Sequence, residues 1–173
     1  MRRRFHRIWP ASAGPFCVLI CLLICAILVQ PLDSQTAPAP APPSKFESRV
    51  AEEEARRAMD AFMEAFNSKD PRRWAATLNY PHVRLASNQV RVYQTADEFA
   101  RESQDYAKRL APWDHSRWES MKVIQSGPGK VHFAVTFVRY DAAGKVIGKF
   151  PSFYVVTLKD DHWGVQARSS FAP

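Results

Sequence analysis

The chain has 173 residues, of which 46% are hydrophobic and 24% are charged, a composition that fits one folded domain and little more. Its formal net charge is +7, but no run of five like charges occurs. Binding to nucleic acid normally needs a basic cluster on one face, so we expect no nucleic-acid partner. The three cysteines, Cys17, Cys21 and Cys25, lie in an apolar N-terminal segment, which excludes a disulfide or a thiolate metal site from residues 46–173.

Residues 1–32 have the features of a signal peptide or a signal anchor. A basic start precedes an uninterrupted apolar run from Phe16 to Val29. A run of this length is typical of an export signal, and the longer uncharged stretch around it is also compatible with an uncleaved single-pass membrane anchor. In both cases the positive-inside rule keeps the basic end in the cytoplasm, so the rest is expected to be exported and periplasmic or otherwise extracytoplasmic. Residues 33–45 are rich in alanine and proline, which predicts an extended linker.

Three helices and two short strands are predicted in the first half of the remaining domain, residues 46–173. Apolar residues recur at helical spacing between residues 55 and 66, which predicts an amphipathic helix that ends near Asn67. Asp70-Pro71 can cap and open a short second helix, which Pro81 would end.

After this helix, the predicted strands 82–86 and 90–93 flank a polar turn. A capping box of Thr95 and Glu98 then begins a third helix, which is expected to continue to Leu110.

The last third of the chain is predicted to be antiparallel strand and turn. The expected strands are 113–126, 131–138, 146–159 and 162–171, and they are separated by turns rich in glycine and aspartate. This order predicts an α+β fold in which a curved antiparallel or mixed sheet wraps as a cone around three N-terminal helices, with a hollow at the wide end. Several of the strands are apolar on both faces, which predicts a homodimer formed through the outer face of the sheet.

The layout resembles the nuclear transport factor 2-like superfamily, in particular its SnoaL-like (polyketide-cyclase-like) branch. Residues 61–67 at the end of the first helix, residues 70–74 at the start of the second and residues 161–165 at the last strand carry the resemblance. It covers roughly residues 48–171. The resemblance implies an apolar cavity and frequent dimers. Members of the superfamily include isomerases, cyclases, dehydratases and epoxide hydrolases, and also domains that only bind or associate, so fold leaves function open.

Candidate site residues are few. His82 and Tyr80 lie between the second helix and the first strand, where related enzymes often place an acid–base residue, so they are the candidate catalytic residues. Tyr93, Arg168 and His115 are candidate ligand-binding residues. Strand parity groups Arg168 with Gln166 rather than with Trp163, which also leaves open a position on the outer side of the sheet.

Two functions remain open from the sequence. The first is an exported small-ligand-binding or association module, with a small apolar molecule as its ligand. The second is a cofactor-free lyase or isomerase that acts on a small apolar carbonyl compound, with His82 as the acid or base. The carboxylates expected of isomerases and epoxide hydrolases of this shape have no clear counterpart in the chain, which favours the first. No cofactor and no metal site are expected, because the histidines show no ligand spacing.

Overall fold

The computed structural model describes residues 44–86 and 88–172. The predicted leader and most of the predicted linker lie outside these residues. The described chain forms one six-stranded sheet with the strand order β2-β1-β6-β5-β4-β3. All neighbouring strands are antiparallel except β1 and β6, which are parallel. The strands are β1 (Leu78–Ala86), β2 (Gln89–Tyr93), β3 (His115–Gly127), β4 (Lys130–Tyr140), β5 (Val146–Lys159) and β6 (His162–Ser170).

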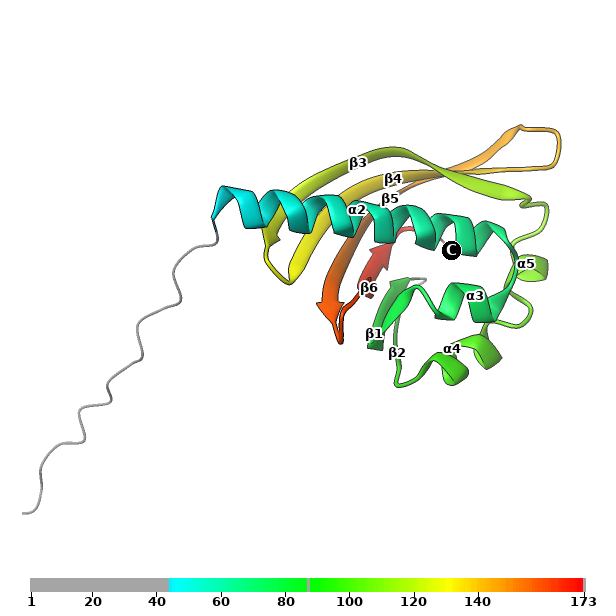
Figure 1. The fold of residues 1–173 in the computed structure, drawn as a ribbon. Helices are drawn as coiled ribbons and strands as arrows, with labels where there is room; N and C mark the ends of the chain where they lie inside the picture. Colours follow the sequence, from blue (N-terminus) through cyan, green and yellow to red (C-terminus); the bar gives the residue numbers. More distant parts are fainter. Residues whose placement is uncertain (1–43, 87, 173) are drawn as a thin grey trace, which may run out of the picture. The chain divides into compact units, whose positions relative to one another are not determined.

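The sheet is curved, and its concave side faces the helices (Figure 1). The long helix α2 (Lys45–Asn67) lies across the concave side, while the short helices α3 (Pro71–Ala75), α4 (Ala96–Glu102) and α5 (Tyr106–Arg109) gather at one end of it. The predicted α+β cone, a mixed curved sheet wrapped around N-terminal helices, is therefore confirmed.

The helix starts follow from local capping. The Ser44 hydroxyl accepts a hydrogen bond from the Glu47 amide at 3.2 Å, and the Glu47 carboxylate accepts one from the Ser44 amide at 2.9 Å. This capping box begins α2. The Asp70 carboxylate accepts a hydrogen bond from the Arg72 amide at 2.8 Å, with Pro71 at the first helical position of α3. The start of the second helix is as predicted.

The third predicted helix is interrupted. The chain forms α4, leaves the helix at Ser103 and re-forms a single turn as α5. Serine and aspartate compete with the helix for backbone hydrogen bonds, which explains why Ser103 to Asp105 do not continue it. The interruption places the buried Ser103 on the wall of the hollow that the next section describes.

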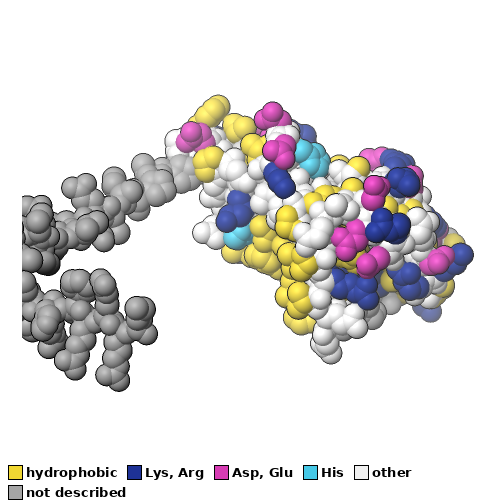
Figure 2. Space-filling model, turned by 90° about the horizontal axis from the view of Figure 1, so that it is seen from below, with side chains coloured by type: hydrophobic (Ala, Val, Ile, Leu, Met, Phe, Trp, Pro, Cys, Tyr) yellow, Lys and Arg dark blue, Asp and Glu magenta, His cyan; other side chains and the backbone are white. Residues whose placement is uncertain are grey.

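The core lies between α2 and the concave face of the sheet. Its most buried side chains include Phe133 and Val131 of β4, Val156 of β5 and Val165 of β6, all with 0% exposure. Within residues 44–86 and 88–172, no helix is both long enough and apolar enough to cross a membrane. Figure 2 shows one face of the domain, on which hydrophobic side chains form a patch and charges of both signs are interspersed.

Candidate functional site

A cavity of about 510 Å³ lies between the helices and the concave side of the sheet. Aromatic side chains from α2, α3, α4, α5 and three of the strands line it: Phe62, Phe66, Trp74, Tyr93, Phe99, Tyr106, Phe137 and Tyr154. The rings pack against one another mostly edge to face or tilted, with Trp74 at 4.9 Å from Phe66 and at 4.8 Å from Phe99 between ring centroids, and Phe66 stacks on Tyr106. A cavity with such walls suits a ligand with a flat apolar body.

Three arginines of the cavity stand in one row across neighbouring strands. Arg91 of β2 is the cross-strand partner of Arg84 of β1, and Arg84 is the partner of Arg168 of β6. Tyr154 of β5 continues the row as the partner of Arg168. Side chains paired in this way start about 5 Å apart, and like charges directly opposite each other destabilise a sheet. The arginine row (Arg91, Arg84 and Arg168) is therefore an electrostatic cost to the fold.

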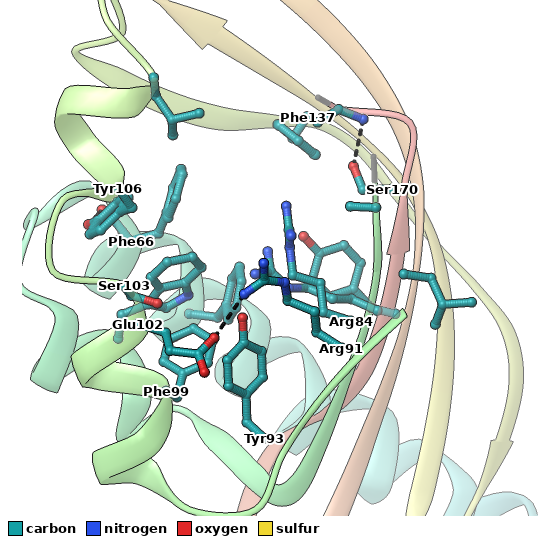
Figure 3. A pocket seen from close by; sticks show the side chains of 18 of the residues that line it. Phe66, Arg84, Arg91, Tyr93, Phe99, Glu102, Ser103, Tyr106, Phe137 and Ser170 are labelled. Carbon is teal, nitrogen blue, oxygen red and sulfur yellow. Dashed lines mark hydrogen bonds and ion pairs between the residues drawn. The ribbon is translucent and has the colours of Figure 1, made fainter. Parts of the chain in front are cut away.

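A fourth arginine, Arg139 at the end of β4, also lines the cavity. Its guanidinium lies 4.9 Å from the centre of the Phe150 ring, and that of Arg168 lies 5.0 Å from the centre of the Trp74 ring. Cation–π contacts of this kind hold a guanidinium in place without neutralising its charge. The side chains of Arg84 and Arg91 are seen in Figure 3.

The surroundings of Arg84 and Arg139 disfavour their protonated, charged forms. Burial, followed by the positive charge of Arg168, lowers the pKa of Arg84 to about 10. Burial and the charge of Arg168 likewise lower the pKa of Arg139 to about 10. Both groups still carry their proton at neutral pH, so the cavity is strongly positive.

Glu102 of α4 is the one acidic residue among those that line the cavity. Its carboxylate accepts a hydrogen bond from Arg91 at 2.9 Å (Figure 3). Among the residues that the structure describes, Arg84, Arg139 and Arg168 take part in no ion pair. The protein thus neutralises one member of the arginine row and leaves the other two, with Arg139, without a counter-charge.

Two predicted ligand-binding residues lie at the cavity, Tyr93 and Arg168. Arg168 reaches it because β6 is irregular. Val156 pairs with Val165 but Val155 pairs with Ala167, so Gln166 is an extra residue that changes the alternation of side chains. Simple parity from Trp163 would have put Arg168 on the outer face, and the bulge at Gln166 is the reason that it faces inward.

His82 is fully buried and packs against Tyr93 and Phe99, but it is not among the residues that line the cavity. Its Nδ1 lies 3.0 Å from the Val165 carbonyl oxygen, and its Nε2 is buried without a hydrogen-bond partner. Burial lowers the pKa of His82 to about 3, helped by the positive charge of Arg168. The ring is therefore neutral at physiological pH, with its Nδ1–H donating to that carbonyl. Its role as an acid or base stays a prediction.

Tyr80 and His115 also lie outside the set of lining residues. The Tyr80 hydroxyl donates a hydrogen bond to the Ala75 carbonyl at 2.9 Å, and burial raises its pKa. The Nδ1 of His115 lies 3.0 Å from the Asp114 carboxylate, and its ring stacks on Tyr140 at 5.0 Å. The structure therefore does not bring these two side chains together with Tyr93 and Arg168.

Of the arginines at the cavity, Arg168 was predicted and Arg84, Arg91 and Arg139 were not, although the sequence held a signal for Arg84 and Arg139. Arg139 continues the alternation of Val131, Phe133, Val135 and Phe137 along β4, so it shares their inward face. Arg84 has the parity of His82, which was expected to face inward. The sequence does not show that β1 lies beside β6, so nothing in it aligns Arg84 with Arg168.

Comparison with solved structures supports the fold. The chain is similar to a putative calcium/calmodulin dependent protein kinase II association domain from Xanthomonas campestris, with a TM-score of 0.54, 18% identity and coverage of 69% of this chain and 86% of that one. An NTF2-like protein with a cystatin-like fold from Novosphingobium aromaticivorans aligns with a TM-score of 0.60, 10% identity and coverage of 73% and 84%. At these identities the likeness shows the fold alone.

A third solved structure, an NTF-2 like protein of unknown function from Shewanella oneidensis MR-1, aligns with a TM-score of 0.54 and 12% identity, covering 70% of this chain and 98% of that one. No curated protein matches the sequence. The model of the family described as NTF2-like protein (DUF6841) matches residues 52–170, which include all six strands and all the lining residues of the cavity except Ala172. The chain belongs to this NTF2-like family.

Proposed function

We propose that this domain is a binding module that holds a small organic molecule with a flat, largely apolar body. The observation that carries the proposal is the aromatic lining of a cavity of about 510 Å³. A volume of this size accommodates a compact ligand, and aromatic walls give contact area without a loss of side-chain freedom on binding.

The same site supports binding over the lyase or isomerase alternative. General acid–base chemistry needs a titrating group within hydrogen-bond reach of the ligand, about 3 Å. The one carboxylate among the lining residues, Glu102, is engaged by Arg91 at 2.9 Å. His82 packs against Tyr93 and Phe99 and is not among the residues that line the cavity. The arrangement of these groups suits holding a molecule rather than moving a proton on it.

The proposal is tested by ligand-detected NMR on the full-length chain with three naphthalene compounds: neutral 2-naphthamide, anionic 2-naphthoate and cationic 2-naphthylmethylamine. At least one should bind, and Ser103→Trp should abolish that binding, because Ser103 is buried on the cavity wall. Ser120→Trp is the control, since Ser120 is exposed on β3. Absence of binding at millimolar concentration would overturn the proposal. So would unchanged binding in a folded Ser103→Trp variant.

A further inference from the structure

We infer that the molecule held in the cavity is an organic oxyanion, whose charged oxygens lie against the guanidinium groups of Arg84 and Arg168 while its flat body lies against the aromatic walls. This inference rests on the proposed binding function and adds the chemical class of the ligand to it. Three independent features of the described residues lead to it.

The first feature is the register of the arginine row. Arg91, Arg84 and Arg168 occupy directly paired positions on three adjacent strands. Arg84 and Arg168 are partly buried. Replacing a buried charge with an apolar side chain of similar volume is often neutral or stabilising, so a fold that served stability alone has no need of charges at these two positions. A negatively charged ligand that pairs with these guanidinium groups would explain why the row is present.

The second feature is the lack of a counter-charge within the described chain. Glu102 serves Arg91, and no carboxylate is paired with Arg84, Arg139 or Arg168. The Nε atoms of Arg139 and Arg168 are buried and have no hydrogen-bond partner. Charges removed from water are normally paired, because an isolated charge loses its hydration and gains no ion pair or hydrogen bond to compensate for that loss. An oxyanion in the cavity supplies the missing charge.

The third feature is the way in which Arg168 is held. Its guanidinium lies 5.0 Å from the centre of the Trp74 ring and 5.5 Å from that of Phe62. A guanidinium stacked on aromatic rings is fixed in orientation and keeps its N–H edge available, and that edge matches the two oxygens of a carboxylate or phosphate group. Tyr154, the cross-strand partner of Arg168, adds a hydroxyl at the same place in the cavity.

The cavity is also polarised from one side to the other. In Figure 3, Arg84 and Arg91 extend from the strands into the space, while the rings of Phe66, Phe99 and Tyr106 stand on the helix side. A ligand with one charged end and one flat apolar end satisfies both sides at once. A purely apolar molecule would leave the arginines desolvated and unpaired, which disfavours it.

The test compares two ligands that differ in charge but hardly in shape, 2-naphthoate and 2-naphthamide, by isothermal titration calorimetry on the full-length chain. A parallel titration with 2-naphthyl phosphate distinguishes a carboxylate from a phosphate head group, and tighter binding of either anion supports the inference. The variants are Arg168→Gln and Arg84→Gln, so that a folding defect in one leaves the other informative. Arg117→Gln is the control, because it removes the same charge from an exposed position on β3.

The better anion should bind at least about tenfold more tightly than the amide, since hydrogen bonds to charged groups are worth more than neutral ones. Each cavity variant should weaken anion binding about tenfold and change amide binding by less than about twofold, with no effect of Arg117→Gln. Equal affinities of anions and amide would overturn the inference and leave the proposed function standing. Binding of none of these three compounds would overturn the inference, and it would overturn the proposed function as well if 2-naphthylmethylamine also failed to bind.

Discussion

Arg84 and Arg168 are partners in the parallel ladder between β1 and β6, and neither forms an ion pair within residues 44–86 and 88–172. Two like charges held in register on the concave side of a sheet reduce the stability of the fold. A site that lowers stability in this way is a sign that the residues serve binding rather than packing.

Arg84→Met should therefore stabilise the protein in the absence of ligand. The substitution keeps an unbranched side chain but removes the charge that burial and Arg168 disfavour. We expect the free energy of unfolding to rise by about 1 kcal/mol, measured by urea denaturation at neutral pH.

The matched control for this prediction is Arg117→Met, at an exposed position of β3. It should change the free energy of unfolding by less than about 0.5 kcal/mol. Relief of repulsion can only raise the free energy of unfolding. If Arg84→Met instead lowered it by about 1 kcal/mol or more, Arg84 would be a structural residue and not a source of electrostatic cost.

Stability should depend on pH through His82. Burial lowers the pKa of His82 to about 3 in the folded protein, from an ordinary value of 6.5. Between these values the unfolded chain binds a proton that the folded chain does not. Stability is therefore fully present above pH 6.5 and falls as the pH drops, by at most about 1.4 kcal/mol per pH unit.

His82→Asn provides the comparison, because an asparagine amide can still donate a hydrogen bond to the Val165 carbonyl that the Nδ1 of His82 contacts. Urea denaturation between pH 5 and pH 7 should show a clear slope in the wild type and a much smaller one in this variant. Equal slopes in the two proteins would mean that His82 titrates normally and is more accessible than its 0% exposure indicates.

Much of the fold was predictable because it depends on local patterns. The caps at Asp70 and Thr95 and the alternation along β4 depend on neighbouring residues, and the structure confirms them. The third helix was predicted to be continuous but is interrupted, because the contribution of Ser103 and Asp105 to breaking it is weak next to the apolar spacing on either side.

The site was less predictable because it depends on pairing between distant strands. Tyr93 and Arg168 were predicted to bind a ligand, and both line the cavity. The inward position of Arg168, however, requires the bulge at Gln166. The pairing of Arg84 with Arg168 requires β1 to lie beside β6 and parallel to it, although the two arginines are 84 residues apart in the sequence. Neither relationship has a signature in nearby residues.

The side chain of Phe133 should be essential to the core. It has 0% exposure on β4 beneath α2, and Arg56 of α2 lies 5.7 Å from the centre of its ring. Phe133→Ala should cost about 3–5 kcal/mol of unfolding free energy, measured by urea denaturation. Phe153→Ala on the neighbouring strand is the control, since that ring is 36% exposed and should matter far less. Similar losses in the two variants would show that the inward and outward faces of the sheet are assigned wrongly.

We propose that two copies of the chain associate through the outer face of the sheet. Phe153 of β5 and Ile124 of β3 are 36% and 55% exposed, and Val155 is only partly buried. Sedimentation of the full-length chain at micromolar concentration should show a dimer, and Phe153→Arg should shift it toward monomer. A monomeric wild type would contradict the proposal, and so would a dimer that Phe153→Arg leaves intact.

The central claim is that the cavity holds an organic oxyanion with its head group on the arginine row, and a crystal structure with 4-iodobenzoate tests it most directly. Iodine gives an anomalous signal that fixes the direction of the ligand. We expect carboxylate oxygens within about 3 Å of guanidinium nitrogens of Arg84 and Arg168, and iodine on the side of Phe66 and Phe99. Iodobenzoate bound in the reverse direction, or bound elsewhere with the cavity of about 510 Å³ left unoccupied, would contradict it.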